Sequence, residues 1–571
     1  MKIQGIAASP GIAIGEVVRL QKIKHEFRKT IAAEEVLQEK ERFSAAKKAA
    51  LTELEDLKAR TAANFGQEKA EVFGAHQMML EDPMFNDAVA EAIVSRYASS
   101  EAAIEEAVES IAGMLAALDD PYMRERAADI RDIGQRLIRI LQGVTEEVKP
   151  TGIVVAQDLL PSDTAALDLA VVTGFITALG GKTSHSSILA RAAGIPAVVG
   201  VGRAWEDLQN GDTVIIDGHA GLVLVNPSDA DLAEYKERKR IEQEKTAEIA
   251  AVAGLEGVTA DGWRVEVAAN IGTPKDMEKA TAAGAEGVGL FRTEFLFQER
   301  QAVPTEEEQV AAYSAVLRAM PDRKIVIRTL DAGGDKQLPF LGTLEEANPA
   351  LGFRAIRLCL TYRDVFKTQL RALLRAGIEG NLYIMFPMIA TVEELMSAKA
   401  LLSEAAEELA REGIAHRADV PVGIMVEVPA AVAIADILVH EVDFFSIGTN
   451  DLVQYTMACD RMNEHVAYLN DYFHPAVVRL IAQVSRVAQA GGKWIGMCGE
   501  MAGDPLATPL LIGLGLTELS MNTRSVPRVK HCLRRLTLPQ AKAWAGEILA
   551  MRTAGEIKQR LESIAAEIAD Q

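Results

Sequence analysis

The sequence predicts an α/β multidomain protein, in which a small α/β domain carries an inserted helical bundle and is followed by a (β/α)8 TIM barrel. The length of 571 residues exceeds what one hydrophobic core supports and suggests roughly three or four domain-sized units. Between about residues 26 and 141, Gly and Pro become scarce and apolar residues recur at helical spacing. Residues 261–571 hold eight short apolar runs, mostly separated by helical-looking stretches, which is the strand number of a (β/α)8 barrel.

The small α/β domain is expected to be discontinuous in sequence. Residues 1–20 alternate in polarity and carry Gly and Pro, which favours short strands and turns. Similar runs return after residue 150, at 152–159, 171–181, 196–202 and 212–218. We therefore expect residues 1–20 and 145–226 to form one domain. Residues 21–144 would be the helical insertion, with breaks near EDP (81–83) and DDP (119–121).

A charged segment separates this domain from the expected barrel. Residues 227–260 are rich in Glu, Lys and Ala, which predicts a helical linker. The barrel domain would then occupy residues 261–571. Its eight strands are expected in the apolar runs at 263–272, 286–295, 324–334, 382–389, 422–430, 443–451, 493–503 and 517–522.

Composition excludes some classes of protein. The formal net charge of -21 argues against a nucleic-acid partner, because phosphate backbones need clustered Lys and Arg. It fits a partner with a basic face, although acidity is also common among soluble cytoplasmic proteins. The N-terminus lacks a signal-peptide pattern, and no run approaches the ~20 apolar residues that span a bilayer, so a cytoplasmic protein without membrane insertion is expected. The cysteines form no Cys-x-x-Cys pair and are interpreted as free thiols of a reducing compartment: Cys359, Cys459, Cys498 and Cys532.

Polar side chains gather at the ends of the expected barrel strands, where function collects in such a barrel. A lone Arg there is usually a solvated loop charge, and a lone Cys in an apolar run is usually part of the core. The joint pattern is more informative, because three cations and two carboxylates would meet at one mouth. The residues are Arg292, Arg328, Glu427, Asn450, Asp451, Arg461 and Cys498.

That mixture suits a small phosphorylated acid bound together with a divalent metal. Guanidinium groups bind carboxylate and phosphate through paired hydrogen bonds. Glu427 and Asp451 would supply the hard oxygen ligands that Mg²⁺ prefers.

A second cluster surrounds His185, in the string GGKTSHSSILARAAGIPAVVG (180–200). His185 lies where a helix is expected to begin, among Ser184, Ser186 and Ser187. Backbone N–H groups at a helix start bind anions, and hydroxyls there cap the helix or bind a phosphate. A neutral imidazole in this setting can attack phosphorus, although a surface histidine that merely caps a helix is the ordinary alternative. The remaining candidates lack such surroundings: His76, His219, His440 and His474.

These strings resemble signatures of the phosphoenolpyruvate-utilising enzymes. The string around His185 is similar to their phosphohistidine signature. GVGLFRTEFLF, DFFSIGTNDLVQYTMACDR and GMCGEMAGD resemble their barrel signatures. The domain order resembles the Enzyme I branch of the family, the phosphoenolpyruvate–protein phosphotransferases of the bacterial sugar phosphotransferase system. The resemblance covers nearly the whole chain, including SPGIAIG near the start and ERAADIRDIGQRL (125–137).

The resemblance implies a role for each matching residue. His185 would carry the phosphoryl group on Nε2, and Thr164 would help to hold it. Cys498 would protonate C3 of the enolpyruvate. Glu427 and Asp451 would hold Mg²⁺ next to the substrate. The remaining substrate-binding residues would be Arg292, Arg328, Arg354, Asn450 and Arg461.

The resemblance also implies partners. The helical insertion would dock HPr, the small phosphocarrier protein that receives the phosphoryl group, and pyruvate would be released in this first step of sugar uptake. Two barrels would pair into a homodimer. One departure from the family pattern is NDYFHPA (470–476), where a Tyr-Gln and a Pro are usual, and it leaves the local geometry near the mouth open.

Three other functions fit part of the pattern. A pyruvate phosphate dikinase or phosphoenolpyruvate synthase fragment shares both motifs but needs an upstream ATP-binding domain, which this sequence lacks. A non-catalytic scaffold would be expected to lose some ligand positions, whereas here all the matching positions are filled. The nitrogen-regulatory paralogue carries an extra N-terminal sensory domain, and nothing precedes the SPGIAIG region here.

Overall fold

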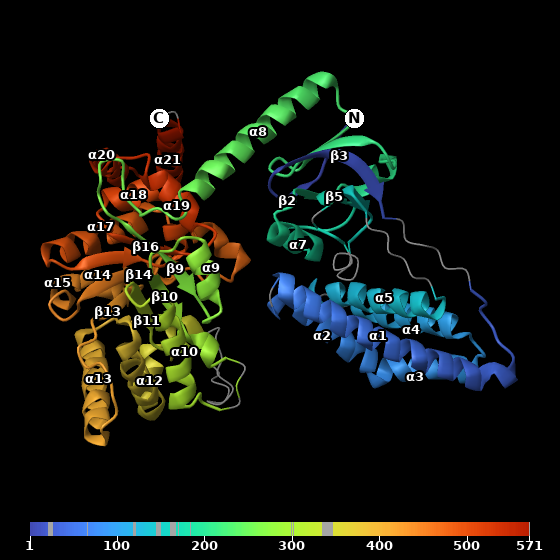
Figure 1. Ribbon diagram of the computed structural model, residues 1–571, viewed down its shortest axis with the longest axis horizontal. Coiled ribbons are helices and arrows are strands. Elements are labelled where there is room, and N and C mark those ends of the chain that lie inside the picture. The colour runs from blue at the N-terminus through green and yellow to red at the C-terminus, as the bar shows by residue number, and fades with distance from the viewer. Residues whose placement is uncertain are drawn as a thin grey trace. The chain divides into compact units, whose positions relative to one another are not determined.

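The computed structural model (Figure 1) describes residues 1–20, 27–65, 67–117, 121–143, 150–159, 167–169, 171–182, 184–298, 300, 302–333 and 346–569. The chain divides into two compact units, residues 1–244 and 245–571. The division falls within the charged segment that predicts a linker. The predicted fold class is confirmed, because an α/β sheet domain with a helical bundle occupies the first unit and a closed parallel barrel the second.

The first unit contains a mixed eight-stranded sheet in the order β1-β8-β7-β3-β4-β5-β6-β2. The β3–β4, β4–β5 and β5–β6 pairs are parallel, and the other pairs are antiparallel. Strand β8 follows β7 after a tight turn and was not predicted, because its four apolar residues are too few to stand out. The strands are β1 (Lys2–Gln4), β2 (Ile6–Ser9), β3 (Ile12–Arg19), β4 (Gly152–Ala156), β5 (Val172–Thr177), β6 (Ala197–Val199), β7 (Thr213–Asp217) and β8 (Leu222–Val225).

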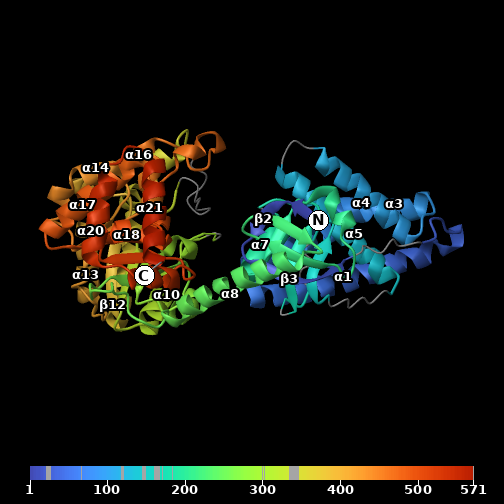
Figure 2. The ribbon, with the colours of Figure 1, turned by 90° about the horizontal axis from the view of Figure 1, so that it is seen from above.

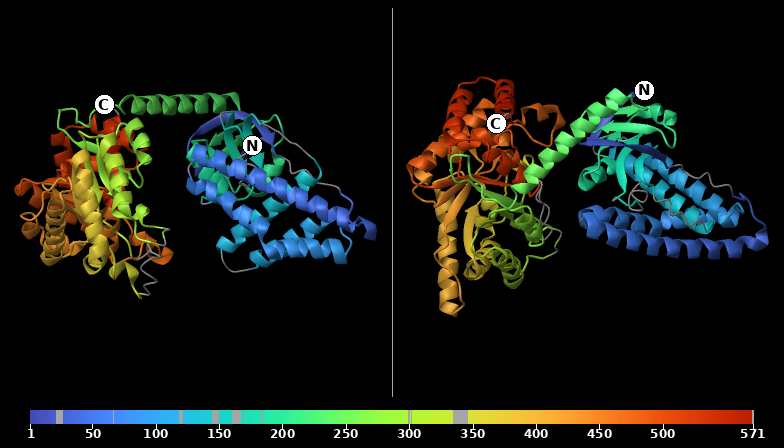
Figure 3. Two further views of the ribbon diagram at one scale, coloured as in Figure 1. Left: turned by 60° about the horizontal axis from the view of Figure 1, so that its bottom comes forward. Right: turned by 45° about the horizontal axis from the view of Figure 1, so that its top comes forward.

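Five long helices form a bundle in the same unit, packed around a core that includes Phe73, Phe85 and Leu137 (Figure 3). The predicted break at EDP is explained by Asp82, whose side chain accepts a hydrogen bond from the Met84 N–H at 2.7 Å before the next helix begins. The other predicted break, at 119–121, lies partly outside the described residues. The helices are α1 (Val36–Phe65), α2 (Gln67–Glu81), α3 (Pro83–Ser95), α4 (Ser100–Ala116) and α5 (Pro121–Leu141), preceded by the 3-10 turn η1 (Ala33–Glu35).

Helix α7 (His185–Ala193) lies between β5 and β6 in the sequence and packs against β2 and β6 of the sheet. The 3-10 turn η2 (Gly202–Asp207) follows β6, and helix α8 (Asp229–Ala251) follows β8. Helix α8 spans the division between the two units, and each part is held by its own unit. In the first, Arg238 pairs with Asp217 at 2.9 Å. In the second, Arg535 pairs with Glu248 at 2.8 Å.

The second unit is a closed barrel of eight parallel strands in sequential order, with helices around the outside (Figure 2). Each predicted apolar run contains one strand, apart from an offset of one residue at β12. The strands are β9 (Glu266–Ile271), β10 (Val288–Arg292), β11 (Lys324–Arg328), β12 (Asn381–Phe386), β13 (Val422–Val426), β14 (Phe444–Ile447), β15 (Trp494–Met497) and β16 (Glu518–Met521).

The barrel helices pack their apolar faces onto the strands and enclose the largest core of the molecule. They are α9 (Asp276–Ala282), α10 (Glu306–Ala319), α11 (Ile356–Thr361), α12 (Arg363–Ala376), α13 (Val392–Glu412), α14 (Pro429–Ala433), α15 (Ala435–Leu438), α16 (Thr449–Met457), α17 (Pro475–Ala490), α18 (Thr508–Gly513), α19 (Val526–Leu533), α20 (Leu538–Leu549) and α21 (Ala554–Ala569). Short 3-10 turns are η3 (Thr293–Leu296), η5 (Pro349–Leu351), η6 (Gly377–Glu379), η7 (Glu464–Leu469) and η8 (Glu500–Gly503). Over the described part of the chain, no helix combines the length and apolarity needed to cross a membrane.

The N-terminal end of the barrel is closed by a charged and aromatic cluster, the bottom cluster. Lys324 Nζ lies 2.8 Å from Glu266 and 3.4 Å from Glu518, and it sits 3.8 Å from the centre of the Trp494 ring. Burial raises the pKa of Glu518 to about 7. The cluster combines an ion pair with a cation–π contact, which is how a buried lysine is kept charged.

Candidate active site at the barrel mouth

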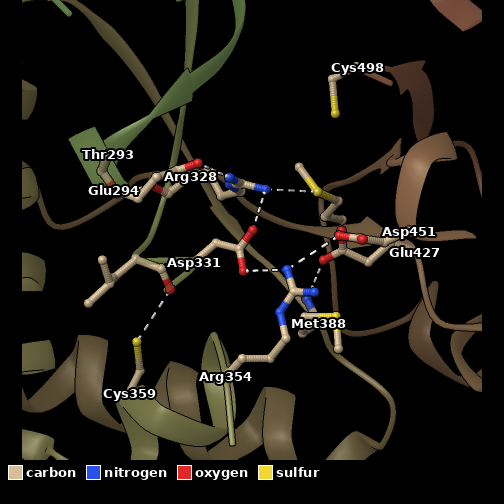
Figure 4. Close-up of polar contacts among 12 residues, drawn as sticks. Thr293, Glu294, Arg328, Asp331, Arg354, Cys359, Met388, Glu427, Asp451 and Cys498 are labelled. Carbon is tan, nitrogen blue, oxygen red and sulfur yellow. Dashed lines mark hydrogen bonds and ion pairs between the residues drawn. The ribbon is translucent and has the colours of Figure 1, made fainter. Parts of the chain in front are cut away.

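The C-terminal ends of the barrel strands bring four predicted residues together (Figure 4). Arg328 is the last residue of β11, Glu427 follows β13 directly, and Asp451 lies in the first turn of α16 after β14. Arg354 reaches the same place from the segment before α11. All four side chains are buried, with exposed fractions between 1% and 7%.

An alternating chain of ion pairs, the mouth chain, connects these residues. Arg328 pairs with Asp331 at 2.9 Å, and Asp331 pairs with Arg354 at 2.9 Å. Arg354 then reaches Asp451 at 3.3 Å, and Asp451 reaches Arg461 at 3.3 Å. Of the predicted residues, Arg354 and Arg461 contact Asp451 directly, and Arg328 is joined to Arg354 through Asp331.

Two buried carboxylates of the mouth were not predicted. Asp331 bridges two arginines of the mouth chain, and Glu294 pairs with Arg328 at 2.8 Å. Both follow strand ends, in the strings FRTE and RTLD. Their positions just after a strand end could have indicated a place in the mouth, but a carboxylate at such a position is usually exposed to solvent.

The buried arginines keep their charge. Burial opposes the charged form of Arg328, but the carboxylates of Glu294 and Asp331 outweigh it and hold its pKa above the ordinary value. The same balance, with Asp331 and Asp451, raises the pKa of Arg354. The Nε–H groups of both arginines are buried without a hydrogen-bond partner among the described residues. Unpaired donors of this kind favour an anionic ligand that accepts from them.

Glu427 is a strongly perturbed carboxyl group of the mouth. Its Oε1 accepts a hydrogen bond from the Met388 N–H at 2.6 Å, and the side chain is 1% exposed. Burial raises its pKa to about 8, and the negative charges of Asp451 and Asp331 add to the effect. A bound cation would reverse this, because it favours the ionised carboxylate.

The carboxylates of the mouth fit Mg²⁺ better than a metal ion whose ligands all come from the protein. Among the described residues, no group of three or more His, Cys, Asp or Glu side chains is arranged to hold a metal ion. Mg²⁺ usually takes one or two carboxylates, keeps several waters and uses substrate oxygens for the rest. Glu427 and Asp451 lie side by side at the mouth in Figure 4 and match that requirement.

Three further predicted residues lie around this centre. Arg292 ends β10, and Asn450 precedes Asp451 in α16. The Asn450 side chain accepts a hydrogen bond from the Glu500 N–H at 3.1 Å, which joins the loop after β14 to the loop after β15. Arg461 is held through its own N–H, which donates to the Gln454 side chain at 3.1 Å.

Cys498 follows β15 and is 2% exposed. Its thiol is 3.8 Å from the carbonyl oxygen of Ile447 and lies apart from the mouth chain in Figure 4. Burial raises the pKa of the thiol to about 11. The group is therefore protonated at neutral pH and able to act as an acid.

The second predicted cluster begins helix α7 at His185, whose side chain lies outside the described residues. The neighbouring serines hold the preceding turn. Ser184 and Ser187 both donate to the carbonyl oxygen of Gly181, at 2.9 and 2.7 Å. The Ser184 hydroxyl makes no capping bond to the helix, so of the two roles considered for the hydroxyls, capping is not filled by this residue. Thr164 also lies outside the described residues.

Three family descriptions match the sequence. "PEP-utilising enzyme, PEP-binding domain" matches residues 246–538, "PEP-utilising enzyme, N-terminal" matches 4–126, and "PEP-utilising enzyme, mobile domain" matches 148–221. The chain belongs to the PEP-utilising enzyme family. The resemblance read from the motifs is thereby confirmed, and so is the expectation of an enzyme.

Relatives of this PEP-utilising enzyme match over almost their full length. A protein of Bacillus sp. (strain S) named phosphoenolpyruvate-protein phosphotransferase is 49% identical over 563 residues, covering 97% of this chain and 96% of the relative. One of Priestia megaterium with the same name is 46% identical, covering 98% and 99%. A solution structure described as Enzyme I (nEIt) is 38% identical, covers 42% of this chain and 99% of that chain, and has a TM-score of 0.37.

The atypical segment 470–476 of this PEP-utilising enzyme is firmly attached. The Tyr472 hydroxyl donates to Asp504 at 2.9 Å, and Asp471 pairs with Lys558 of α21 at 2.7 Å. Phe473 is buried at 2% exposure. These contacts fix the conformation of the segment, for which the sequence had left the local geometry open.

Proposed function

We propose that this chain transfers the phosphoryl group of phosphoenolpyruvate to its own His185, releases pyruvate, and passes the phosphoryl group to HPr in the first step of sugar uptake. The names of its near full-length relatives support the reaction. The observation that carries the proposal is the mouth chain, where buried arginines lie beside two carboxylates and their Nε–H groups have no hydrogen-bond partner in the part of the chain that the structure describes.

The mouth suits phosphoenolpyruvate because that molecule carries two anionic groups a short distance apart. Arg328 and Arg354 keep their charge while buried, so they bind an anion without first losing much water. Arg292, Asn450 and Arg461 would complete the contacts to phosphate and carboxylate. Paired guanidinium contacts also fix the orientation of the substrate, which a phosphoryl transfer requires.

We propose Mg²⁺ as the cofactor, held by Glu427 and Asp451. When bound, it supplies positive charge to neutralise the phosphate as the bond to the enol oxygen breaks. The two carboxylates orient this charge next to the arginines. Glu427 would lose its proton on metal binding, because its pKa of about 8 in the metal-free protein reflects burial without a cation.

The chemical steps follow from the side chains. The His185 imidazole would attack phosphorus in line with the leaving enol oxygen, and the arginines would stabilise the charge on both sides. The pyruvate enolate would then take a proton at C3 from the Cys498 thiol, which gives the keto form. Thr164 would help to hold the phosphorylated imidazole.

We further propose the macromolecular partners and the location. The helical bundle α1–α5 would dock HPr, two barrels would pair into a homodimer, and the protein would work in the cytoplasm. Because His185 must meet both the barrel mouth and HPr, the two units would reorient about α8 during each cycle. A cross-link across residues 227–260 should block one of the two transfers, and full turnover in the cross-linked form would contradict the swing.

The decisive experiment follows a labelled phosphoryl group. The chain is mixed with ³²P-phosphoenolpyruvate, Mg²⁺ and HPr, and the label is traced. We expect label on His185 and then on HPr, and none on a His185→Ala variant. Label retained by that variant would place the acceptor elsewhere. Incubation with labelled ATP tests the dikinase alternative, which requires label on His185 from ATP.

A further inference from the structure

An amide side chain on the first barrel strand holds the backbone of Cys498. The Asn270 Nδ2–H donates to the carbonyl oxygen of Cys498 at 2.9 Å. The Ser520 hydroxyl donates in turn to Asn270 Oδ1 at 2.7 Å. Asn270 lies on β9 and Ser520 on β16, so the amide reaches across one strand to the end of β15.

The hydrogen-bonding capacities of these groups fix the orientation of the amide. A carbonyl oxygen only accepts, so the Asn270 group that faces Cys498 must be the NH₂. The amide oxygen then faces Ser520, whose hydroxyl must donate. Ser520 is fully buried, which holds its hydroxyl next to this acceptor.

The carbonyl that Asn270 binds lies beyond the sheet ladder. The pairing of β15 with β16 joins Gly496 to Glu518 and Met497 to Leu519, and it ends there. On the other side, the Cys498 N–H donates to the Ile447 carbonyl oxygen at 3.0 Å. Cys498 is therefore held by its N–H from β14 and by its carbonyl from Asn270.

The neighbouring residue restricts this backbone further. A Cβ added to Gly499 would lie 1.9 Å from the Thr449 hydroxyl oxygen, so the loop after Cys498 packs directly against the start of α16. With both peptide groups of Cys498 fixed, the direction of its Cα–Cβ bond is fixed as well. That direction limits the positions that the thiol sulfur can reach.

We propose that Asn270 is a positioning residue for Cys498. By holding the Cys498 backbone, Asn270 determines which face of the enolpyruvate receives the proton from the thiol. The inference rests on the proposed function. In the step concerned, the C2–C3 π electrons of the enolate form the new C3–H bond, and the S–H electron pair remains on sulfur as a thiolate. Water then returns a proton to the thiolate after pyruvate has left.

The test measures stereochemistry as well as rate. The full chain, Mg²⁺ and HPr react in tritiated water with phosphoenolpyruvate that carries deuterium at one of the two C3 positions. The pyruvate methyl group is then analysed for chirality. We expect one configuration from the unsubstituted chain. Asn270→Ala should give mixed configurations and lower kcat by about 10²-fold, with KM for phosphoenolpyruvate changed less than about threefold.

Matched variants separate positioning from stability. Asn270→Asp keeps the size of the side chain but replaces the N–H donor, so it should show the same loss of selectivity. Gln489→Ala is the control, because Gln489 also donates to a serine and a backbone carbonyl, Ser485 at 3.0 Å and Leu514 at 3.1 Å, away from Cys498. It should lower stability to a similar degree and retain a single configuration.

Each outcome bears on one conclusion. A single configuration and full kcat in both Asn270 variants would overturn the inference. If those variants do not fold, Ser520→Ala provides the test, because it keeps the Asn270 amide but removes the hydrogen bond that orients it. Unchanged stereoselectivity in Ser520→Ala would also overturn the inference. Failure of the unsubstituted chain to consume phosphoenolpyruvate would instead contradict the proposed function.

Discussion

The two ends of the barrel both bury charged residues, but the partners that neutralise the buried cations differ between the ends. At the N-terminal end, Lys324 pairs with Glu266 and Glu518 and lies against the Trp494 ring. At the C-terminal end, the mouth chain alternates arginines and carboxylates, and the described residues offer no hydrogen-bond partner to the Nε–H groups of Arg328 and Arg354. Strand β11 contributes a cation to both ends, because it begins at Lys324 and ends at Arg328.

The difference teaches how a buried cation can serve either stability or binding. An ammonium is a compact charge that two carboxylates and an aromatic ring saturate. A guanidinium presents five N–H donors in a plane, so the carboxylates beside it leave donors for a ligand. We therefore expect substitutions in the bottom cluster to change stability and substitutions in the mouth to change activity.

The largest effect is expected at the proposed metal site. Glu427→Gln should lower Mg²⁺-dependent phosphorylation by phosphoenolpyruvate at least about 10³-fold, because the charge that neutralises the phosphate is lost. Phosphoryl exchange between phospho-HPr and His185 should persist, since it does not use the mouth. Both reactions are measured with ³²P label. Glu407→Gln, an exposed glutamate of α13, is the control, and loss of both reactions in Glu427→Gln would make Glu427 structural.

Lys324→Met should lower stability and leave activity almost unchanged, the opposite of Glu427→Gln. Removing the cation leaves two carboxylates facing each other in a largely buried site, which should lower the free energy of unfolding by about 3 kcal/mol. Activity per folded molecule should stay near that of the unsubstituted chain. Denaturant unfolding and the phosphorylation rate measure the two quantities. Lys558→Met breaks a more exposed ion pair and should cost at most about 1 kcal/mol. An equal loss in the two variants would contradict the comparison.

The pH dependence of stability should differ between the ends. Burial raises the pKa of Glu518 to about 7 and that of Glu427 to about 8, against 4.5 for an ordinary glutamate. The folded protein then holds protons that the unfolded chain has released, so stability should fall as pH rises from about 4.5 through these values.

Two variants separate the contributions to this pH dependence. Glu518→Gln should remove part of the fall below pH 7, and Glu427→Gln should remove the part that continues to about pH 8. Added Mg²⁺ should oppose only the Glu427 contribution, with release of a proton. Thermal unfolding between pH 5 and 9, with and without Mg²⁺, measures each part. A flat profile in metal-free protein would contradict the pKa directions.

The smallest effect is expected from a residue that supports an arginine. The Tyr455 hydroxyl accepts a hydrogen bond from Arg354 at 3.2 Å and donates to the Ala350 carbonyl at 2.5 Å. Tyr455→Phe removes both hydrogen bonds and should raise KM for phosphoenolpyruvate by about fivefold, the effect expected from losing the contact to Arg354, with little change in kcat. Steady-state kinetics measure the split. A large loss of kcat instead would give Tyr455 a direct part in the reaction.

Sequence patterns predicted the positions of the strands better than the side-chain contacts that join distant parts of the chain. Each barrel strand lies in one contiguous apolar run, so local information was sufficient. Arg292 and Arg328 could be predicted because each stands in an apolar run at a strand end, whereas Arg354 was expected only from the family resemblance. Asp331 and Glu294 could not, since their burial depends on arginines that reach them in space. The Lys324–Glu518 pair joins positions 194 residues apart, and Asn270 reaches Cys498 across 228 residues. No local pattern encodes such distances.

Helix α8 is anchored in both units, which makes it sensitive to insertions. Arg238 pairs with Asp217 at 2.9 Å, and Glu248 pairs with Arg535 at 2.8 Å. Each residue of an α-helix adds 1.5 Å and about 100°. One residue inserted between Arg238 and Glu248 would therefore turn one anchor by more than a quarter of a revolution about the helix axis relative to the other. Seven inserted residues would restore nearly the original rotation and lengthen the helix by about 10 Å.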